Sequence, residues 1–260
     1  MRRTRIGIAV AAGMLLGAAA APAQTAEELV EKNIRARGGM EKIKSIQSMR
    51  MTGKMALGEE SAPTVLEFKR PGRLRWEFTL GGQTGIQAYD GTTGWAVMPF
   101  EGSAEPRKLP AEEIENVKRQ ADLDGPLVDY KAKGNRIELV GKGTAAGGRD
   151  AWKLKVTAPD GEERVVFLDA ESGLQVQTVA RKKIDGEDVE IVSVIGDYRD
   201  VGGLKLPHSF ESNVTGVPET QSMKFDRIEL NVPLEDSRFV MPKARAPEAT
   251  PPPAATPSVS

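Results

Sequence analysis

Alternation of apolar and polar side chains with a period of two is the feature that most restricts how this chain can fold. It is clearest from Leu74 to Leu80, where every second residue is apolar. Successive side chains of a β-strand point to opposite faces, so this pattern predicts a strand with one apolar and one polar face. Similar segments occupy residues 48–100. They predict an antiparallel meander, because tight turns separate them at Pro71-Gly72, Gly81-Gly82 and Asp90-Gly91.

A second block of alternating segments begins near Arg136 and ends at about Leu230. It includes two long predicted strands, residues 174–183 and 187–199, joined at Asp185-Gly186. Both blocks together predict about eleven strands, which we interpret as two halves of one sheet. Side chains just fill a barrel of eight strands, and this chain is only 5% aromatic. About eleven strands therefore predict a hollow that helices fill only in part, leaving an apolar cavity.

Helical patterns are confined to the start of the chain and to the region between the two strand blocks. Thr25 and Glu28 have the spacing of a capping box, and Gly38-Gly39 is a typical helix end. Pro110 opens a later helix through Ala121. We expect these helices to pack on the apolar face of the sheet, in a mainly β chain of the α+β class. The predicted helical segments are residues 25–37, 40–45, 110–121 and one further turn at 127–130.

The first 23 residues have the pattern of a signal peptide. Three arginines precede an apolar stretch, and Ala21-Pro22-Ala23 forms a cleavage site before Gln24. The apolar stretch is short for a membrane span, although a retained anchor helix is the alternative. No cysteine is present for lipid attachment. We expect a periplasmic protein without a lipid anchor, with one domain over residues 24–241 and a disordered, proline-rich tail over 242–260.

Composition excludes several classes of function. The chain has no cysteine, so it can form no disulfide, thiolate nucleophile or cysteine-ligated metal site. Its only histidine is His208, which leaves histidine-based triads and metal sites without enough groups. Without the signal peptide, 33 basic residues face 37 acidic ones, a balance that argues against nucleic-acid binding. We expect no catalytic residues, no metal and no cofactor.

Spaced motifs between Leu66 and Phe100 resemble those of the LolA/LolB family of lipoprotein carriers. They are the Lys69-Arg70-Pro71 turn, Trp76, the hairpin from Asp90 to Trp95, and the pair Pro99-Phe100. The resemblance implies an incomplete antiparallel barrel, an apolar cavity for acyl chains, and helices that cover the open side. It also implies that Arg70 is a latch to these helices. The implied ligands are lipid or lipoprotein acyl chains, carried by a monomer between an inner-membrane donor and an outer-membrane acceptor.

The apolar face of the first predicted strands supplies the candidate cavity wall. Methionine is unbranched and polarizable, so it adapts to ligands without a fixed shape. Ordinary core packing is the alternative for all of these residues. The alternative for Arg70 is a solvated turn, whereas an arginine inside a cavity would need partners such as carbonyls at a helix C-terminus. The candidate ligand-binding residues are Met49, Met51, Met55, Leu66, Phe68, Leu74, Trp76 and Phe78.

These features favour a periplasmic carrier that binds acyl chains or lipoproteins non-covalently for transfer toward the outer membrane. Each exposed CH₂ costs roughly 0.8 kcal/mol in water, so an acylated cargo needs a cover to cross an aqueous gap. Three alternatives stay open at this point. They are a lipid- or lipoprotein-sensing domain of an envelope-stress regulator, an enzyme acting on envelope lipids, and a structural protein with a filled core.

Overall fold

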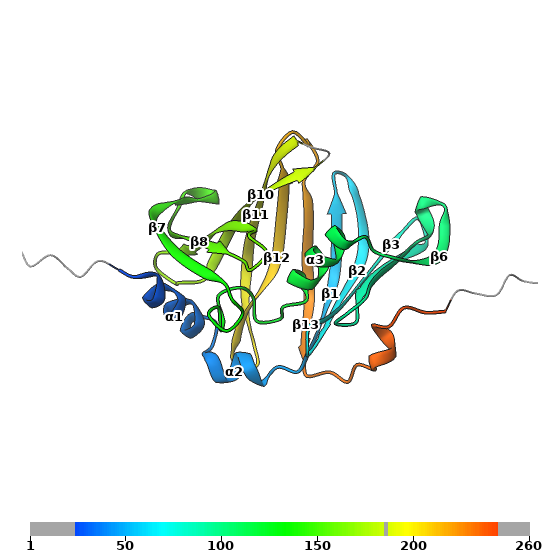
Figure 1. The fold of residues 1–260 in the computed structure, drawn as a ribbon, viewed down its shortest axis with the longest axis horizontal. Helices are drawn as coiled ribbons and strands as arrows, with labels where there is room; N and C mark the ends of the chain where they lie inside the picture. The colour runs from blue at the N-terminus through cyan, green and yellow to red at the C-terminus, as the bar shows by residue number, and fades with distance from the viewer. Residues whose placement is uncertain (1–23, 185–186, 244–260) are drawn as a thin grey trace, which may run out of the picture.

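A computed structural model describes residues 24–184 and 187–243 of the chain. The predicted signal peptide, residues 1–23, lies outside the described residues, as do residues 244–260 of the predicted tail and the turn at 185–186. In the described part, thirteen strands form one antiparallel sheet that does not close (Figure 1). The fold is thus mainly β, as predicted, with thirteen strands rather than about eleven.

The elements follow the predicted order of a leading helical region, a strand block, a helix and a second strand block. The helices are α1 (Ala26–Ala36), α2 (Met40–Ser45) and α3 (Ala111–Gln120). The strands are β1 (Ser48–Leu57), β2 (Glu60–Lys69), β3 (Arg73–Leu80), β4 (Gln83–Tyr89), β5 (Gly94–Met98), β6 (Ser103–Lys108), β7 (Arg136–Ala145), β8 (Arg149–Thr157), β9 (Glu163–Asp169), β10 (Gln175–Ile184), β11 (Glu187–Val201), β12 (Leu204–Val214) and β13 (Gln221–Leu230).

Two local predictions were wrong in the region between the strand blocks. Strand β6 lies where no strand was expected and pairs with β5 at the edge of the sheet. Its residues are almost all exposed, so no apolar alternation marks it. Residues 127–130 form a turn rather than helix. Leu127 and Val128 are buried there, so tertiary packing rather than helical periodicity explains their apolar character.

Pairing of β1 with β13 joins the two strand blocks into one sheet. The strand order runs β6-β5-β4-β3-β2-β1-β13-β12-β11-β10-β9-β8-β7, so β6 and β7 are the edges. The register between β1 and β13 shifts at Thr52 and Gly53. A Cβ atom on Gly53 would lie 2.0 Å from the carbonyl oxygen of Lys224. The close approach of the two blocks therefore requires glycine at this position.

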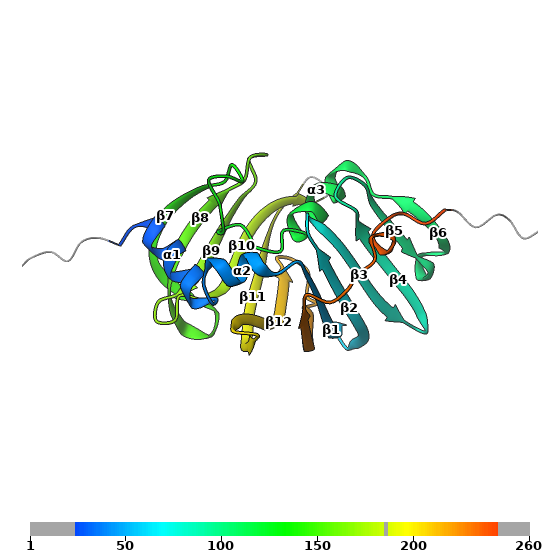
Figure 2. The same ribbon diagram turned by 90° about the horizontal axis from the view of Figure 1, so that it is seen from below.

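All three helices pack on one face of the sheet, which we call the inner face (Figure 2). Ile43 of α2 and Val117 of α3 join a core cluster with Met51 and Leu74 of the first block. Helix α1 instead packs on the second block through a cluster that includes Leu154. The predicted capping box of α1 is confirmed. We call the three helices and the segment 121–135 the helical cover.

The opposite, outer face of the first block is not simply polar, as the alternation predicted. Residues 231–243 cross it, and Figure 2 shows this segment passing over the strands near β5. Trp95 and Phe239 are buried beneath and within the segment, and the Trp95 indole donates a hydrogen bond of 2.7 Å to the Phe239 carbonyl. Glu67 is also buried, because Arg50 and Arg238 both bind its carboxylate.

Candidate functional site

The eight predicted ligand-binding residues share the inner face of β1, β2 and β3. The register places Met51 opposite Leu66, and Leu66 opposite Trp76. Five of the eight are buried, whereas Met49, Leu66 and Trp76 are partly exposed. The indole of Trp76 donates a hydrogen bond of 2.8 Å to the Thr64 hydroxyl. The buried members of the set are Met51, Met55, Phe68, Leu74 and Phe78.

These residues divide between two core clusters. Met51, Phe68 and Leu74 pack with residues of α2 and α3. Met55 and Phe78 form a smaller cluster farther along the same strands, where the Phe78 ring also lies 5.5 Å from that of Phe100. In this arrangement Met51, Phe68 and Leu74 fill the space against the helical cover, whereas Met55 and Phe78 pack away from it. Their role as a ligand-binding wall stays a prediction.

Arg70 connects the turn between β2 and β3 to the helical cover. Its Nε donates a hydrogen bond of 2.6 Å to the carbonyl of Ile46, just after α2, and Nη2 reaches the Ile43 carbonyl at 3.3 Å. The two terminal nitrogens also bind both carboxylate oxygens of Asp124, at 3.0 and 2.5 Å. The guanidinium thus has carbonyl partners in the α2 region and a carboxylate partner in segment 121–135. Breaking these hydrogen bonds would release both parts of the cover from the turn between β2 and β3.

Asp124 is the electrostatic centre of these contacts. Its side chain is only 3% exposed, and Lys44 of α2 also binds it, at 2.8 Å. Burial raises the pKa of the Asp124 carboxyl, but hydrogen bonds from Arg70 and Lys44 outweigh burial and lower this pKa to about 2. Lys44 also pairs with Asp129 at 2.5 Å. The carboxylate therefore stays ionised at neutral pH and holds segment 121–127 against α2.

A cavity of about 180 Å³ lies between the helical cover and the inner face of the second block. Arg37, at the end of α1, contributes to its wall, opposite Tyr198 of β11. The apolar part of the wall comes from segment 121–127 and from strands β11 and β12. None of the eight predicted residues lines this cavity. Its lining residues are Asn33, Arg37, Asp122, Leu123, Asp124, Gly125, Pro126, Leu127, Gln175, Ile195, Tyr198, Leu206, Pro207 and Phe210.

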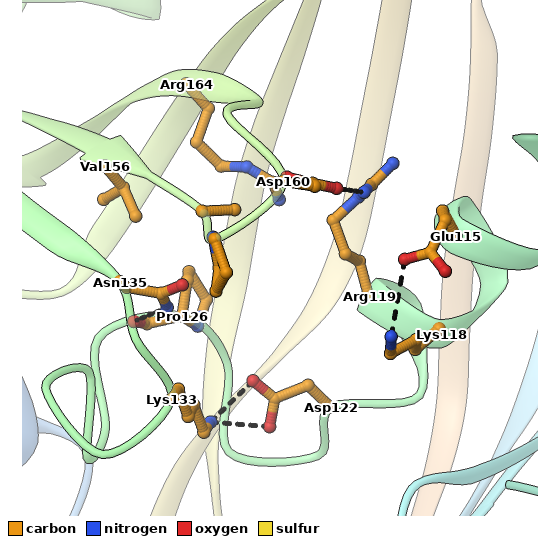
Figure 3. A pocket seen from close by; sticks show the side chains of 12 residues that line it. Glu115, Lys118, Arg119, Asp122, Pro126, Lys133, Asn135, Val156, Asp160 and Arg164 are labelled. Atoms are coloured by element: carbon orange, nitrogen blue, oxygen red, sulfur yellow. Dashed lines mark hydrogen bonds and ion pairs between the residues drawn. The ribbon is translucent and has the colours of Figure 1, made fainter.

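A second, larger hollow of about 410 Å³ lies between α3 and the β8–β9 turn (Figure 3). Charged side chains line much of it, and most are paired with one another. Arg119 of α3 binds Asp160 of the turn at 2.6 Å, and Lys133 binds Asp122 at 2.6 Å. The ion pair between Arg119 and Asp160 connects α3 to the second block across this hollow, whose wall also includes apolar residues such as Val156 and Pro159.

Sequence reasoning missed the roles of Arg37, Lys44 and Asp124 in this region. Nothing in the local sequence marks Asp124 as the partner of an arginine 54 positions earlier. His208 is buried on β12, with Nδ1 3.0 Å from the Leu206 carbonyl. Across residues 24–184 and 187–243, no group of three or more acidic, histidine or cysteine side chains is placed to hold a metal ion.

Comparison with solved structures shows that the fold is similar to that of a protein described as a member of the LolA superfamily. A LolA superfamily protein from Nitrosomonas europaea superposes with a TM-score of 0.57 over 84% of this chain and 98% of its own, at 12% identity. A domain described as an outer membrane lipoprotein-sorting protein, from Vibrio parahaemolyticus, gives 0.54 over 81% and 97%, at 11% identity. A DUF1329 family protein from Desulfovibrio piger gives 0.57 over 84% and 98%, at 12% identity.

No protein-family model matches the sequence, and no curated protein matches it. The likeness to the solved structures is therefore one of fold. Among the described residues, none of the helices is both long enough and apolar enough to cross a bilayer.

Proposed function

We propose that this protein is a periplasmic carrier that binds acyl chains of lipids or lipoproteins beneath its helical cover. The single observation that carries the proposal is the set of contacts from Arg70 to α2 and Asp124. These contacts fasten the helical cover to an open sheet with an apolar inner face, and the proposed function requires that this cover move. The name of the Vibrio parahaemolyticus domain, a lipoprotein-sorting protein, supports the same reading.

The size of the cavity at Arg37 fits a closed, unloaded carrier. Sites for drug-sized ligands occupy roughly 300–1,000 Å³, and this cavity holds about 180 Å³. A long acyl chain therefore does not fit this cavity unless the cover moves away from the sheet. That movement would expose the inner face of β1–β3, including the candidate residues Leu66 and Trp76.

Arg70 then acts as a latch whose bonds oppose loading. Each hydrogen bond to a charged group contributes about 1.5–3 kcal/mol, so removing the donors shifts the balance toward the open form. Arg70→Leu should bind a lipidated peptide at least as tightly as the wild type and should release it more slowly to acceptor membranes. Arg70→Lys should be partly defective, because one ammonium cannot reproduce the planar fork. The measurement is transfer of a fluorescent lipidated peptide to vesicles.

Arg73 gives a matched control at the other end of the same turn. It pairs with Asp236 of the C-terminal segment rather than with the cover, so Arg73→Leu should leave transfer unchanged. If Arg70→Leu transferred the peptide at the wild-type rate, Arg70 would have no role as a latch. Failure of the wild-type protein to bind any acylated probe would contradict the carrier function and favour a structural role.

A fluorescence measurement tests the candidate wall independently. Trp76 lies on the inner face, 4.8 Å from the Phe78 ring and partly exposed. Binding of an acyl chain to this wall should change its emission, and Trp76→Phe should abolish that part of the signal. If the ligand-induced change persists in Trp76→Phe, the chain binds elsewhere beneath the cover.

A further inference from the structure

We propose that Arg37 recognises an anionic oxygen group, a carboxylate or a phosphate, at the head of an acyl-chain ligand. The inference rests on the carrier function proposed above and narrows its ligand class. The place is the cavity between α1, segment 121–127 and strands β11 and β12. Asp124, which Arg70 binds, lines one side of this cavity.

Two backbone hydrogen bonds fix the position of Arg37, one to α1 and one to β12. Its backbone N–H caps α1 by donating to the Asn33 carbonyl at 3.0 Å, and its own carbonyl accepts from the Lys205 N–H of β12 at 3.0 Å. The side chain donates one hydrogen bond, from Nη1 to the Asp124 carbonyl at 2.8 Å. A guanidinium has five N–H donors, so most of its binding capacity remains for a group in the cavity.

Among the described residues, the charged side chains that line the cavity are Arg37, Asp122 and Asp124. Asp124 is bound by Arg70 and Lys44, and Lys133 binds Asp122. Both lining carboxylates thus have cationic partners other than Arg37. In the described part of the chain, Arg37 is the member of this group that forms no ion pair.

Tyr198, which also lines the cavity, cannot serve as a counter-ion for Arg37. The Tyr198 hydroxyl donates a hydrogen bond of 2.7 Å to the Gln175 carbonyl. Burial raises the pKa of Tyr198 to about 12, so the phenol is neutral at physiological pH. Burial lowers the pKa of Arg37, and Tyr198, Asp124 and Asp122 act in the opposite direction. The side chain of Arg37 is partly exposed, so an anionic ligand in the cavity would bind donors that water can otherwise reach.

The shape and lining of the cavity suit the head of an amphipathic ligand. Its volume of about 180 Å³ corresponds to about six water molecules at roughly 30 Å³ each. That space holds a carboxylate or phosphate with a short length of chain. Ile195, Leu206 and Phe210 provide apolar wall beside the guanidinium. Phe210 also lies 6.0 Å from the Phe225 ring of β13, so the apolar surface continues toward the first block.

Three twelve-carbon probes that differ only at the head test the inference: dodecanoate, dodecyl phosphate and dodecanol. Isothermal titration of the wild-type protein should show at least about tenfold tighter binding of the two anionic probes than of dodecanol. Arg37→Met should lose that preference and keep the affinity for dodecanol, whereas Arg37→Lys should keep part of it. Arg35→Met is the matched control, because Arg35 lies on the same helix, is 68% exposed and pairs with Glu31.

The outcomes separate this inference from the carrier function. Equal binding of all three probes by the wild type would overturn the role of Arg37 and leave the carrier intact. Binding of none would overturn the carrier itself. Inorganic phosphate that binds as tightly as dodecyl phosphate would show a simple anion site and overturn the acyl-ligand inference. The preference for anionic probes is measured on the wild-type protein, so the test still discriminates if Arg37→Met fails to fold.

Discussion

At the scale of single residues, Asp124 shows how one carboxylate can couple the cover to pH. Its pKa in the folded protein, about 2, is below the ordinary value of 3.8. The stabilisation it gives is therefore complete above about pH 4 and is lost as pH falls toward 2. Its share of the free energy of unfolding at neutral pH should be about 1–2 kcal/mol, after allowance for partial screening.

Comparison of the wild type with Asp124→Asn tests this predicted dependence of stability on pH. Urea unfolding should show the variant less stable by about 1–2 kcal/mol at pH 7, and the difference should shrink by half or more near pH 2.5. Other carboxylates titrate equally in both proteins and cancel. Asp188→Asn is the control, because the Asp188 side chain is 79% exposed and the side chain of its ion-pair partner, Lys183, is 72% exposed. A stability difference that does not change with pH would exclude the charge of Asp124 as its cause.

At the scale of elements, the segment after β13 stabilises the outer face of the first strand block. Phe239 is fully buried and its carbonyl accepts the Trp95 hydrogen bond. Phe239→Ala should lower the free energy of unfolding by about 3–5 kcal/mol, because it leaves a cavity against a tightly packed indole. Val240→Ala should change it by less than about 0.5 kcal/mol, since Val240 is 52% exposed. Urea unfolding followed by tryptophan fluorescence makes the measurement. Equal stability of the two variants would show that the segment does not dock in solution.

The same elements show what could be predicted from the sequence. Hairpins with strong turn residues and regular alternation, such as β3 after Pro71-Gly72, were predicted because both signals are local. The end of the second block was also predicted correctly, because β13 ends at Leu230. Edge strand β6 was missed because an exposed strand has no apolar alternation. The burial of Glu67 and the contacts of Arg37 were missed because partners far along the chain, Arg238 and Asp124, determine them.

At the scale of the whole molecule, the contact between β1 and β13 determines whether the two strand blocks unfold as one unit. The pairing of β1 with β13 joins them, and α2 and α3 pack across residues from both blocks in the same core cluster. We therefore expect a single cooperative unfolding transition for residues 24–241. Hydrogen exchange at low urea should give the same opening free energy for the amides of β2 and β11. Clearly separate values would mean two independent units.

One substitution at Gly53 tests the pairing of β1 with β13. Strands pack here without a side chain between them, and a Cβ at this position would lie 2.0 Å from the Lys224 carbonyl oxygen and 2.6 Å from Phe225 Cα. Backbone cannot yield as a flexible side chain does, so Gly53→Ala should separate β1 from β13 locally. We expect a loss of about 2–4 kcal/mol in the free energy of unfolding and faster exchange of amides on both strands. Gly143→Ala is the control, because its Cβ would meet only the flexible Lys153 side chain on the edge strand pair. Wild-type stability in Gly53→Ala would mean that β1 and β13 do not pair in this register, and the case for a single continuous sheet would fail with it.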